Sequence, residues 1–248
     1  MKKLLYIFTV LTLVGCDSEN APDCFQNTGD IIQKEFTVGA FTKITAFKNV
    51  ELIVTDDTTQ SVVVETGENL LNDVKVTVEN GRLLLKDENG CNLTRDYGIT
   101  KIYVSASNIT EIRNSSQFTV RSNGVLNYSD LKLISEDDSS SDFGNVGIFD
   151  VEVNANSLFV VINNLTTTYV SGTVNNLKVN HASGDGRFEG RNLIAQNADI
   201  YHRGTNDIII NPQVSLEAEL VSTGDVIVVN TPPTLDIQEE FTGRVIFE

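Results

Sequence analysis

The sequence repeats a short turn-like phrase three times in its second half: Ala182-Ser183-Gly184-Asp185, His202-Arg203-Gly204-Thr205 and Ser222-Thr223-Gly224-Asp225. The three glycines recur at the same interval, 20 positions apart in both cases. Apolar runs follow the second and third phrases, at residues 208–210 and 226–229. A fixed period with strand-like segments between turn residues indicates a stacked repeat.

The repeat extends when the chain is written in rows of that length. The turn column then holds Gly144, Asn164, Gly184, Gly204, Gly224 and Arg244, and the column four positions later holds Ile148, Thr168, Phe188, Ile208 and Val228. Gly and Asn tolerate left-handed backbone conformations, whereas apolar or β-branched residues fill a core. These columns predict an all-β solenoid of about 20 residues per coil, in which each coil stacks on the next at about 4.8 Å. The alternative is an antiparallel β-sandwich with evenly spaced turns.

The first half of the chain is also β-rich. Residues 74–78 alternate strictly, Asn80-Gly81 follows, and residues 83–85 are apolar. An Asn-Gly pair between strand-like segments predicts a β-hairpin with a type I′ turn, because both central residues need positive φ.

The amino-acid composition agrees with a β-strand protein, and the net charge limits the classes of binding partner. The chain has one Met and no Trp, and its formal net charge is −16. A nucleic-acid partner needs a basic surface to replace the phosphate counterions, so nucleic acid is excluded as a partner class.

The N-terminus predicts export and anchoring. Lys2 and Lys3 precede an apolar run at residues 4–14, which is too short to span a bilayer, and Gly15 and Cys16 follow. This pattern resembles the lipobox of bacterial lipoproteins, in which cleavage occurs before a lipidated cysteine. We therefore expect residues 1–15 to be a lipoprotein signal peptide and Cys16 to carry the lipid that anchors the protein to the membrane. The alternative is an ordinary secretory signal with an incidental cysteine.

Residues 16–40 form the expected tether, since the segment that follows Cys16 is polar and poor in strand formers. With Cys16 lipidated, Cys24 and Cys91 remain, and a cysteine pair outside the cytoplasm is expected to oxidise. We expect a Cys24–Cys91 disulfide. A metal site is disfavoured because two distant cysteines, His181 and His202 lack ligand spacing.

Residues 41–248, the expected main domain, resemble the putative auto-transporter adhesin, head GIN domain family of Bacteroidetes-type lipoproteins. Phe41-Thr42-Lys43-Ile44, Val50-Glu51-Leu52, Asn80-Gly81 and the iterated glycine turns carry the resemblance. It implies a right-handed parallel β-helix-like fold that is secreted or lipid-anchored. The turns here are degenerate relative to the family's commonest turn, as at Ser115-Ser116-Gln117-Phe118, and the family implies no catalytic residue.

Three groups of residues are candidates for chemistry. Asp185 and Asp225 share a column with Thr205 between them, at about the carboxylate separation of inverting glycosidases, but aspartates after turn glycines more often cap the backbone. The acidic run at residues 135–142 lacks an EF-hand pattern and is expected to be a solvated loop rather than a Ca²⁺ site. His181 and His202 fall in adjacent columns, so alternation predicts that they face opposite sides.

The expected function is therefore a lipid-anchored binding protein of the bacterial cell envelope at the outer membrane, an adhesin that uses no catalytic residue, metal or cofactor and binds a glycan or a surface protein. The first alternative is a carbohydrate-active β-helix enzyme, and the second is a structural envelope protein.

Overall fold

The computed structural model describes residues 23–93, 95–135 and 146–248. The expectations for the signal peptide, for Gly15 and Cys16, for Gly144 and for all but the first residue of the acidic run fall outside these residues. In the described ranges, no helix has both the length and the apolar character needed to cross a bilayer.

The first part of the chain contains short strands and two single-turn 3₁₀ helices. Their bounds are η1 Asp23–Phe25, β1 Ile31–Glu35, β2 Lys43–Ala46, β3 Glu51–Thr55, β4 Ser61–Gly67, η2 Leu71–Asp73, β5 Val74–Glu79, β6 Arg82–Asp87 and β7 Lys101–Ser105. β1 lies within the segment expected as a tether and pairs antiparallel with β4.

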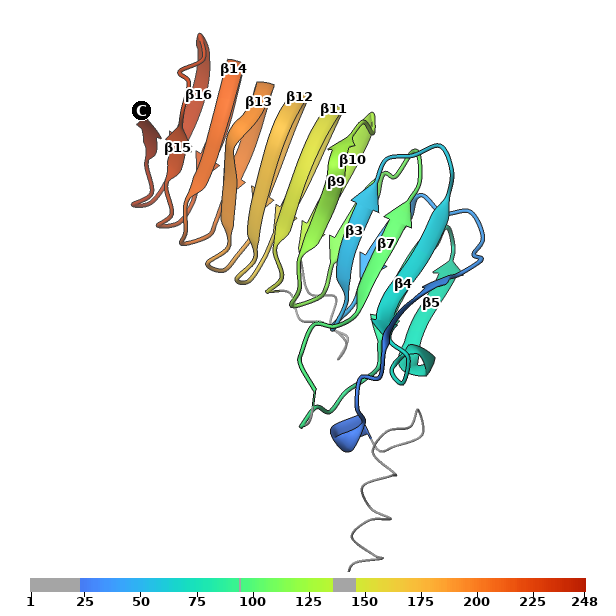
Figure 1. The fold of residues 1–248 in the computed structure, drawn as a ribbon. Coiled ribbons are helices and arrows are strands. Elements are labelled where there is room, and N and C mark those ends of the chain that lie inside the picture. The colour runs from blue at the N-terminus through green and yellow to red at the C-terminus, as the bar shows by residue number, and fades with distance from the viewer. Residues whose placement is uncertain (1–22, 94, 136–145) are drawn as a thin grey trace, which may run out of the picture.

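The second part contains the longer strands. Their bounds are β8 Glu111–Asn114, β9 Val120–Leu126, β10 Asp130–Ser135, β11 Phe149–Ile162, β12 Thr167–His181, β13 Arg187–His202, β14 Ile208–Leu220, β15 Val226–Val228, β16 Thr234–Glu239 and β17 Val245–Phe247. β11 to β14 pair in parallel with one another in chain order, and they form the long central stack in Figure 1.

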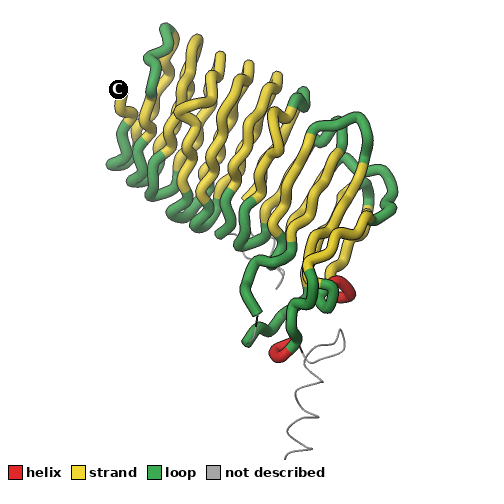
Figure 2. The backbone as a smooth tube through the Cα atoms, in the orientation of Figure 1, coloured by secondary structure: helices red, strands yellow, loops and turns green. Residues whose placement is uncertain are grey.

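The pairings at the two ends of this stack define the coils. The first half of β11 pairs with β9 and its second half pairs with β10. At the other end, the two halves of β14 pair with β15 and β16. Each long strand therefore bends between two halves, and the sheet curls on itself (Figure 2). The side chains on its inner side form the buried core.

Two parallel pairs, β2 with β8 and β3 with β9, join the two parts. Within the first part, β2 also pairs in parallel with β6, and β3 with β7. By contrast, β1–β4, β4–β7 and β5–β6 are antiparallel. The all-β class is confirmed, and the sheet is mixed rather than parallel throughout.

The hairpin of β5 and β6 confirms the Asn-Gly prediction. Asn80 has φ 48° and Gly81 has φ 74°, and the strands close at Glu79 opposite Arg82. Positive φ at both central positions is what a type I′ turn requires.

The core follows from alternation along strands that are stacked in register. Leu158, Leu177, Ala198 and Leu216 lie in one buried column across four strands. Each coil thereby covers the apolar side chains of its neighbour, which no coil could bury alone.

The step between coils varies along the stack, so the strict period fails at both ends. It is 19 where Phe149 pairs with Thr168, and 18 where Ile208 pairs with Val226. The predicted column is therefore correct for Thr168, Phe188 and Ile208, but wrong at its two ends, where Phe149 and Val226 take the places expected for Ile148 and Val228.

Glycine is required at these turns for two different structural reasons. Asn164 has φ 64° and Gly184 has φ 93°, as the turn column predicted. Gly204 and Gly224 do not have positive φ. A Cβ on Gly204 would lie 1.9 Å from Cε1 of His181, so this glycine is needed because the imidazole ring lies directly against its backbone.

Candidate functional site

A groove of about 400 Å³ opens on the outer surface of β11, β12 and β13. It is lined by Asp150, Tyr169, Val170, Ser171, Glu189, Arg191 and Asn192. We call it the Tyr169 groove. It combines one aromatic ring with hydroxyl, amide, carboxylate and guanidinium groups on neighbouring coils.

Strand register explains why these side chains meet. Asp150 pairs with Tyr169, and Tyr169 pairs with Glu189, so the three form one column on consecutive strands about 4.8 Å apart. Phe149 and Val170 point inward and are buried, while alternation turns Tyr169 outward, where it is 44% exposed. The tyrosine ring therefore stands between two carboxylates on the surface.

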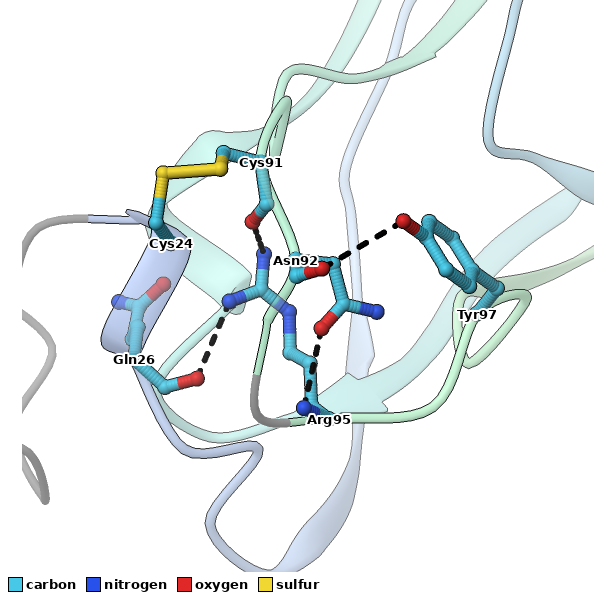
Figure 3. Close-up of a disulfide and its surroundings, with 6 residues drawn as sticks. All are labelled: Cys24, Gln26, Cys91, Asn92, Arg95 and Tyr97. Carbon is cyan, nitrogen blue, oxygen red and sulfur yellow. Dashed lines mark hydrogen bonds between the residues drawn. A yellow bond between two sulfur atoms is a disulfide. The ribbon is translucent and has the colours of Figure 1, made fainter.

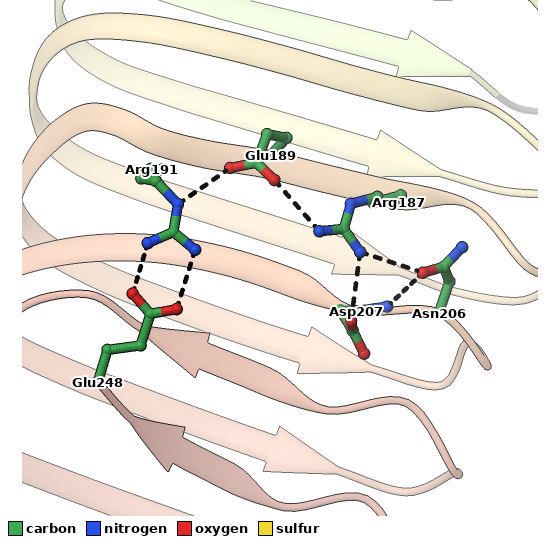
Figure 4. Close-up of polar contacts among 6 residues, drawn as sticks. All are labelled: Arg187, Glu189, Arg191, Asn206, Asp207 and Glu248. Atoms are coloured by element: carbon green, nitrogen blue, oxygen red, sulfur yellow. Dashed lines mark hydrogen bonds and ion pairs between the residues drawn. The ribbon is translucent and has the colours of Figure 1, made fainter.

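A network of ion pairs holds the charged side of the groove (Figure 4). The guanidinium of Arg187 lies 3.2 Å from a carboxylate oxygen of Glu189 and 3.2 Å from one of Asp207. Arg191 contacts Glu189 at 3.9 Å and donates two hydrogen bonds to the carboxylate of Glu248, one of them at 3.0 Å. The C-terminal residue thus fixes the side chain of Arg191 beside the groove.

The pair formed by Arg191 and Glu248 favours the charged form of both groups. The hydrogen bond from Arg191 lowers the pKa of the Glu248 carboxyl below its usual value, and the same bond raises the pKa of Arg191. Both side chains remain open to solvent, so the pair orients Arg191 more than it stabilises the fold.

A second groove of about 390 Å³ lies farther along the same strands. It is lined by Asn127, Ser129, Asn154, Ala155, Asn156, Thr173, Val174, Asn175 and Gln196. We call it the amide groove.

The amides of this region are linked from coil to coil in an amide ladder. It consists of Asn127, Asn154, Asn156, Thr173, Asn175, Asn176, Asn197 and Ser215. Asn154 donates to the side-chain oxygen of Asn127 at 3.1 Å, and Asn175 donates to that of Asn156 at 3.2 Å. Each amide has two donor hydrogens and two acceptor sites, so these contacts leave part of its capacity open.

The two histidines are not placed as alternation predicted. His181 and His202 are register partners on β12 and β13, and both rings are buried. The prediction of opposite faces is wrong because the register between these strands shifts between Tyr169 and Gly172, where β13 bulges. The extra residue in β13 brings the two histidines opposite each other inside the core.

The two turn aspartates bond to the following coil. Asp225 accepts a hydrogen bond from the backbone N–H of Arg244 at 2.8 Å and so caps the backbone as expected, whereas Asp185 accepts one from the side chain of Thr205, through Oγ1, at 2.7 Å. Both contacts tie one coil to the next, which favours a structural role over acid–base chemistry. Within the described ranges, no group of three or more Asp, Glu, His or Cys side chains could hold a metal ion.

The Cys24–Cys91 disulfide is present, as expected (Figure 3). Arg95 donates to the backbone carbonyls of Gln26 and Cys91, so a side-chain bridge lies beside the disulfide. Together they join η1 to the segment that follows β6. Close by, the buried carboxyl of Asp87 accepts a hydrogen bond from Thr100 Oγ1 at 2.6 Å, and desolvation raises its pKa.

Neither groove follows from the sequence alone. Tyr169 sits in an alternating strand, which identifies it as an outward residue, but its carboxylate neighbours come from other coils. Their alignment depends on the pairing of Asp150 with Tyr169 and of Tyr169 with Glu189, which strand register alone reveals.

Comparison with known proteins identifies the family of the chain and solved structures that share its fold. Residues 40–232 match the family model described as putative auto-transporter adhesin, head GIN domain. No curated protein matches the chain.

Solved structures from three bacteria share the fold at low identity. A putative adhesin from Bacteroides fragilis is 19% identical, with a TM-score of 0.77 over 88% of this chain and 97% of that one. A putative lipid binding protein from Parabacteroides distasonis is 15% identical, with a TM-score of 0.59 over the same shares. A putative adhesin from Parabacteroides merdae is 14% identical, with a TM-score of 0.54 over those shares.

Proposed function

Because the chain belongs to the family described as putative auto-transporter adhesin, head GIN domain, we propose that it is a lipid-anchored adhesin of the bacterial cell envelope that binds a glycan without chemical turnover. The observation that carries the ligand class is the Tyr169 groove, in which an exposed aromatic ring stands between Asp150 and Glu189. An aromatic face packs against the apolar face of a sugar ring, while carboxylates, amides and guanidinium groups bond its hydroxyls.

The combination of one aromatic ring with polar and charged side chains favours a glycan over the other ligand classes. A lipid needs a mainly apolar pocket, and the one aliphatic residue that lines this groove, Val170, is buried with its side chain turned into the core. A protein partner needs a broad, flat contact surface, whereas this site is a groove with a volume of about 400 Å³.

The catalytic alternative has weaker support. An inverting glycosidase needs one carboxyl group that donates a proton and one that activates water. Here Glu189 accepts a hydrogen bond from Arg187 and forms an ion pair with Arg191, and both contacts favour the carboxylate over a proton-donating carboxyl group. A structural envelope role remains as the second alternative, and it predicts no ligand for the groove.

The anchor is proposed at Cys16, with cleavage after Gly15. The Cys24–Cys91 disulfide supports an oxidising compartment outside the cytoplasm, where lipoproteins are placed. We also infer that the parallel coils wind in a right-handed sense, as parallel crossovers do.

The ligand is tested with a glycan array probed by wild type and by Tyr169→Ala. We expect wild-type binding that weakens about tenfold or more in the variant, since the ring supplies the stacking surface. Tyr97→Ala, an exposed tyrosine outside this groove, is the control and should bind like wild type. Absence of any bound glycan, or equal binding by Tyr169→Ala, would overturn the glycan proposal.

Catalysis is tested on the bound glycans with a reducing-end assay. The proposal expects no new reducing ends. Turnover that Glu189→Gln or Asp185→Asn abolishes would establish the enzyme instead.

The anchor is tested by labelled palmitate and membrane fractionation of Cys16→Ala. We expect the variant to lose both the label and the membrane association. A variant that keeps both would show that the lipobox interpretation is wrong.

A further inference from the structure

The Tyr169 groove and the amide groove follow each other along the same strands. On β12 the first ends at Ser171 and the second begins at Thr173, with Gly172 between them. On β13 the first ends at Asn192 and the second reaches Gln196. One ligand that runs along the strands would therefore enter both grooves in turn.

The combined length suits an extended chain rather than a single sugar. Tyr169 and Asn175 are six positions apart on β12, so the path from one groove to the other is about 20 Å measured along the strand, including its bend. Gly172 has φ 107°, and a Cβ there would lie 2.0 Å from the carbonyl oxygen of Val153. The missing side chain lets β12 lie directly against β11 between the two grooves.

The chemistry of the amide groove differs from that of the rest of the surface. All of its lining residues are uncharged, although 21% of the chain is charged and the net charge is −16. An anionic ligand is repelled by the acidic protein, and a cationic one finds no carboxylate among the lining residues. A neutral polar group is the remaining match.

The hydrogen-bonding pattern of the amide side chains indicates which neutral group of a ligand fits the amide groove. Within the amide ladder, a side-chain amide donates to the side-chain oxygen of an amide on the preceding coil at 3.1 to 3.2 Å. An acetamido group presents the same donor and acceptor, so it can join this pattern where a bare hydroxyl supplies only part of it.

We propose, resting on the glycan-binding function above, that the amide groove is a second subsite for the same ligand. The ligand is a linear, uncharged polysaccharide that carries N-acetyl groups and lies along β11 to β13 from Tyr169 to Asn175. The first groove holds one end through stacking, and the second reads the acetamido groups of the units that follow.

The test uses N-acetylglucosamine oligomers from the disaccharide to the octasaccharide, with binding measured by calorimetry. Affinity should rise with length until both grooves are filled. Gln196→Ala removes an exposed side chain that has no hydrogen bond within the described residues, so the ladder stays intact. It should weaken octasaccharide binding about three- to tenfold, the effect of one or two hydrogen bonds, and leave the disaccharide unchanged.

Controls separate this subsite from the glycan proposal itself. Tyr169→Ala should weaken oligomers of every length, and Glu217→Ala, outside both grooves, should weaken none. The second subsite would be overturned if affinity did not depend on oligomer length, or if Gln196→Ala bound the octasaccharide as wild type does. In either case, binding of the disaccharide that depends on Tyr169 would still support the glycan-binding function. An array in which charged glycans alone bind through Tyr169 would overturn the neutral, N-acetylated class. An array with no bound glycan would overturn the function and the subsite together.

Discussion

The imidazole rings of His181 and His202 stack inside the core, with their centroids 5.0 Å apart and their planes inclined by 17°. The backbone N–H of Gly204 donates a hydrogen bond to Nδ1 of His202 at 3.3 Å. This bond needs an unprotonated nitrogen, so it is consistent with a neutral ring. Two neutral imidazoles thus serve as flat, semi-polar members of the column between Ile162 and Leu220.

This pair predicts that the protein loses stability in mild acid. Burial, and next the charge of His202, lower the pKa of His181 to about 4, and burial lowers the pKa of His202. The unfolded chain, with histidines near 6.5, binds more protons below that pH, so the stabilisation is complete above about pH 6.5 and is lost as pH falls toward 4. His181 alone accounts for up to about 3 kcal/mol. Urea unfolding between about pH 7.5 and pH 5 measures the loss.

The control is the double variant His181→Phe, His202→Phe, which should show a flatter pH dependence over the same range. Nearby groups temper the effect. The carboxylates of Asp185, Asp207 and Asp225 raise the histidine pKa values. Asp87, with its raised pKa, stabilises the fold toward low pH, in the opposite sense. An equal pH dependence in wild type and the double variant would rule out the histidines as the cause.

The glycines opposite these rings should not tolerate a methyl group. A Cβ on Gly204 would lie 1.9 Å from Cε1 of His181, and one on Gly224 would lie 2.5 Å from Nε2 of His202. We expect Gly204→Ala to destabilise the protein by about 2 kcal/mol or more, because a packed ring must move. Gly39→Ala is the matched control, since a Cβ there meets nothing within 4 Å.

A second variant tests the reason. Replacing His181 by Ala should recover part of the loss in the Gly204→Ala background, and the two changes should couple in a double-mutant cycle. Independent, additive changes in the free energy of unfolding would show that the ring is not the obstacle.

The repeat and the local turns are predictable from the sequence because they depend on neighbours along the chain. Asn80-Gly81 specifies its hairpin by backbone conformation alone, and Gly184 occupies the left-handed turn position that its column predicts. The disulfide follows from the number of cysteines and from the expected compartment. The role of Gly204 is not predictable in this way, because it arises from a contact with the preceding coil.

The register between coils could not be predicted, and both the histidine pair and the grooves depend on it. The register between β12 and β13 shifts between Tyr169 and Gly172, where β13 holds an extra residue. One inserted residue reverses which face a side chain takes. A strictly constant period therefore separates His181 from His202 and leaves the partners of Tyr169 undefined.

Gly172 lies where this register changes, and it predicts an unusually costly substitution. Gly172→Ala combines a positive φ with a collision against the backbone of Val153. Gly124 has φ 84° but an open surrounding, so Gly124→Ala carries the φ cost of about 1 kcal/mol alone. We expect Gly172→Ala to lower the thermal midpoint by several degrees more than Gly124→Ala, as measured by calorimetry. Equal thermal midpoints for the two variants would show that the collision with the backbone of Val153 adds no cost to Gly172→Ala.

The disulfide should contribute more to the free energy of unfolding than to the formation of the β-sheet coils. Cys24 and Cys91 are 67 residues apart, and closing such a loop restricts the unfolded chain by about 4 kcal/mol in the chain-entropy model. We expect Cys24→Ser, Cys91→Ser to lower the free energy of unfolding by a large part of that value and to retain the circular dichroism of the β-sheet. Loss of the β signal in this variant would mean that the bridge is required for folding itself.

The ion pair between Arg191 and Glu248 should contribute little to stability, although it is bidentate. The side chains of Arg191 and Glu248 are 42% and 44% exposed, and solvent screens an exposed pair. We expect Glu248→Gln to leave the urea midpoint of unfolding close to that of wild type. Glu219→Gln, which removes a partly buried carboxylate of β14 outside the network, is the control. A large fall of the midpoint in Glu248→Gln alone would instead show that the contact is required to dock β17 on β15, because Glu248 directly follows that edge strand.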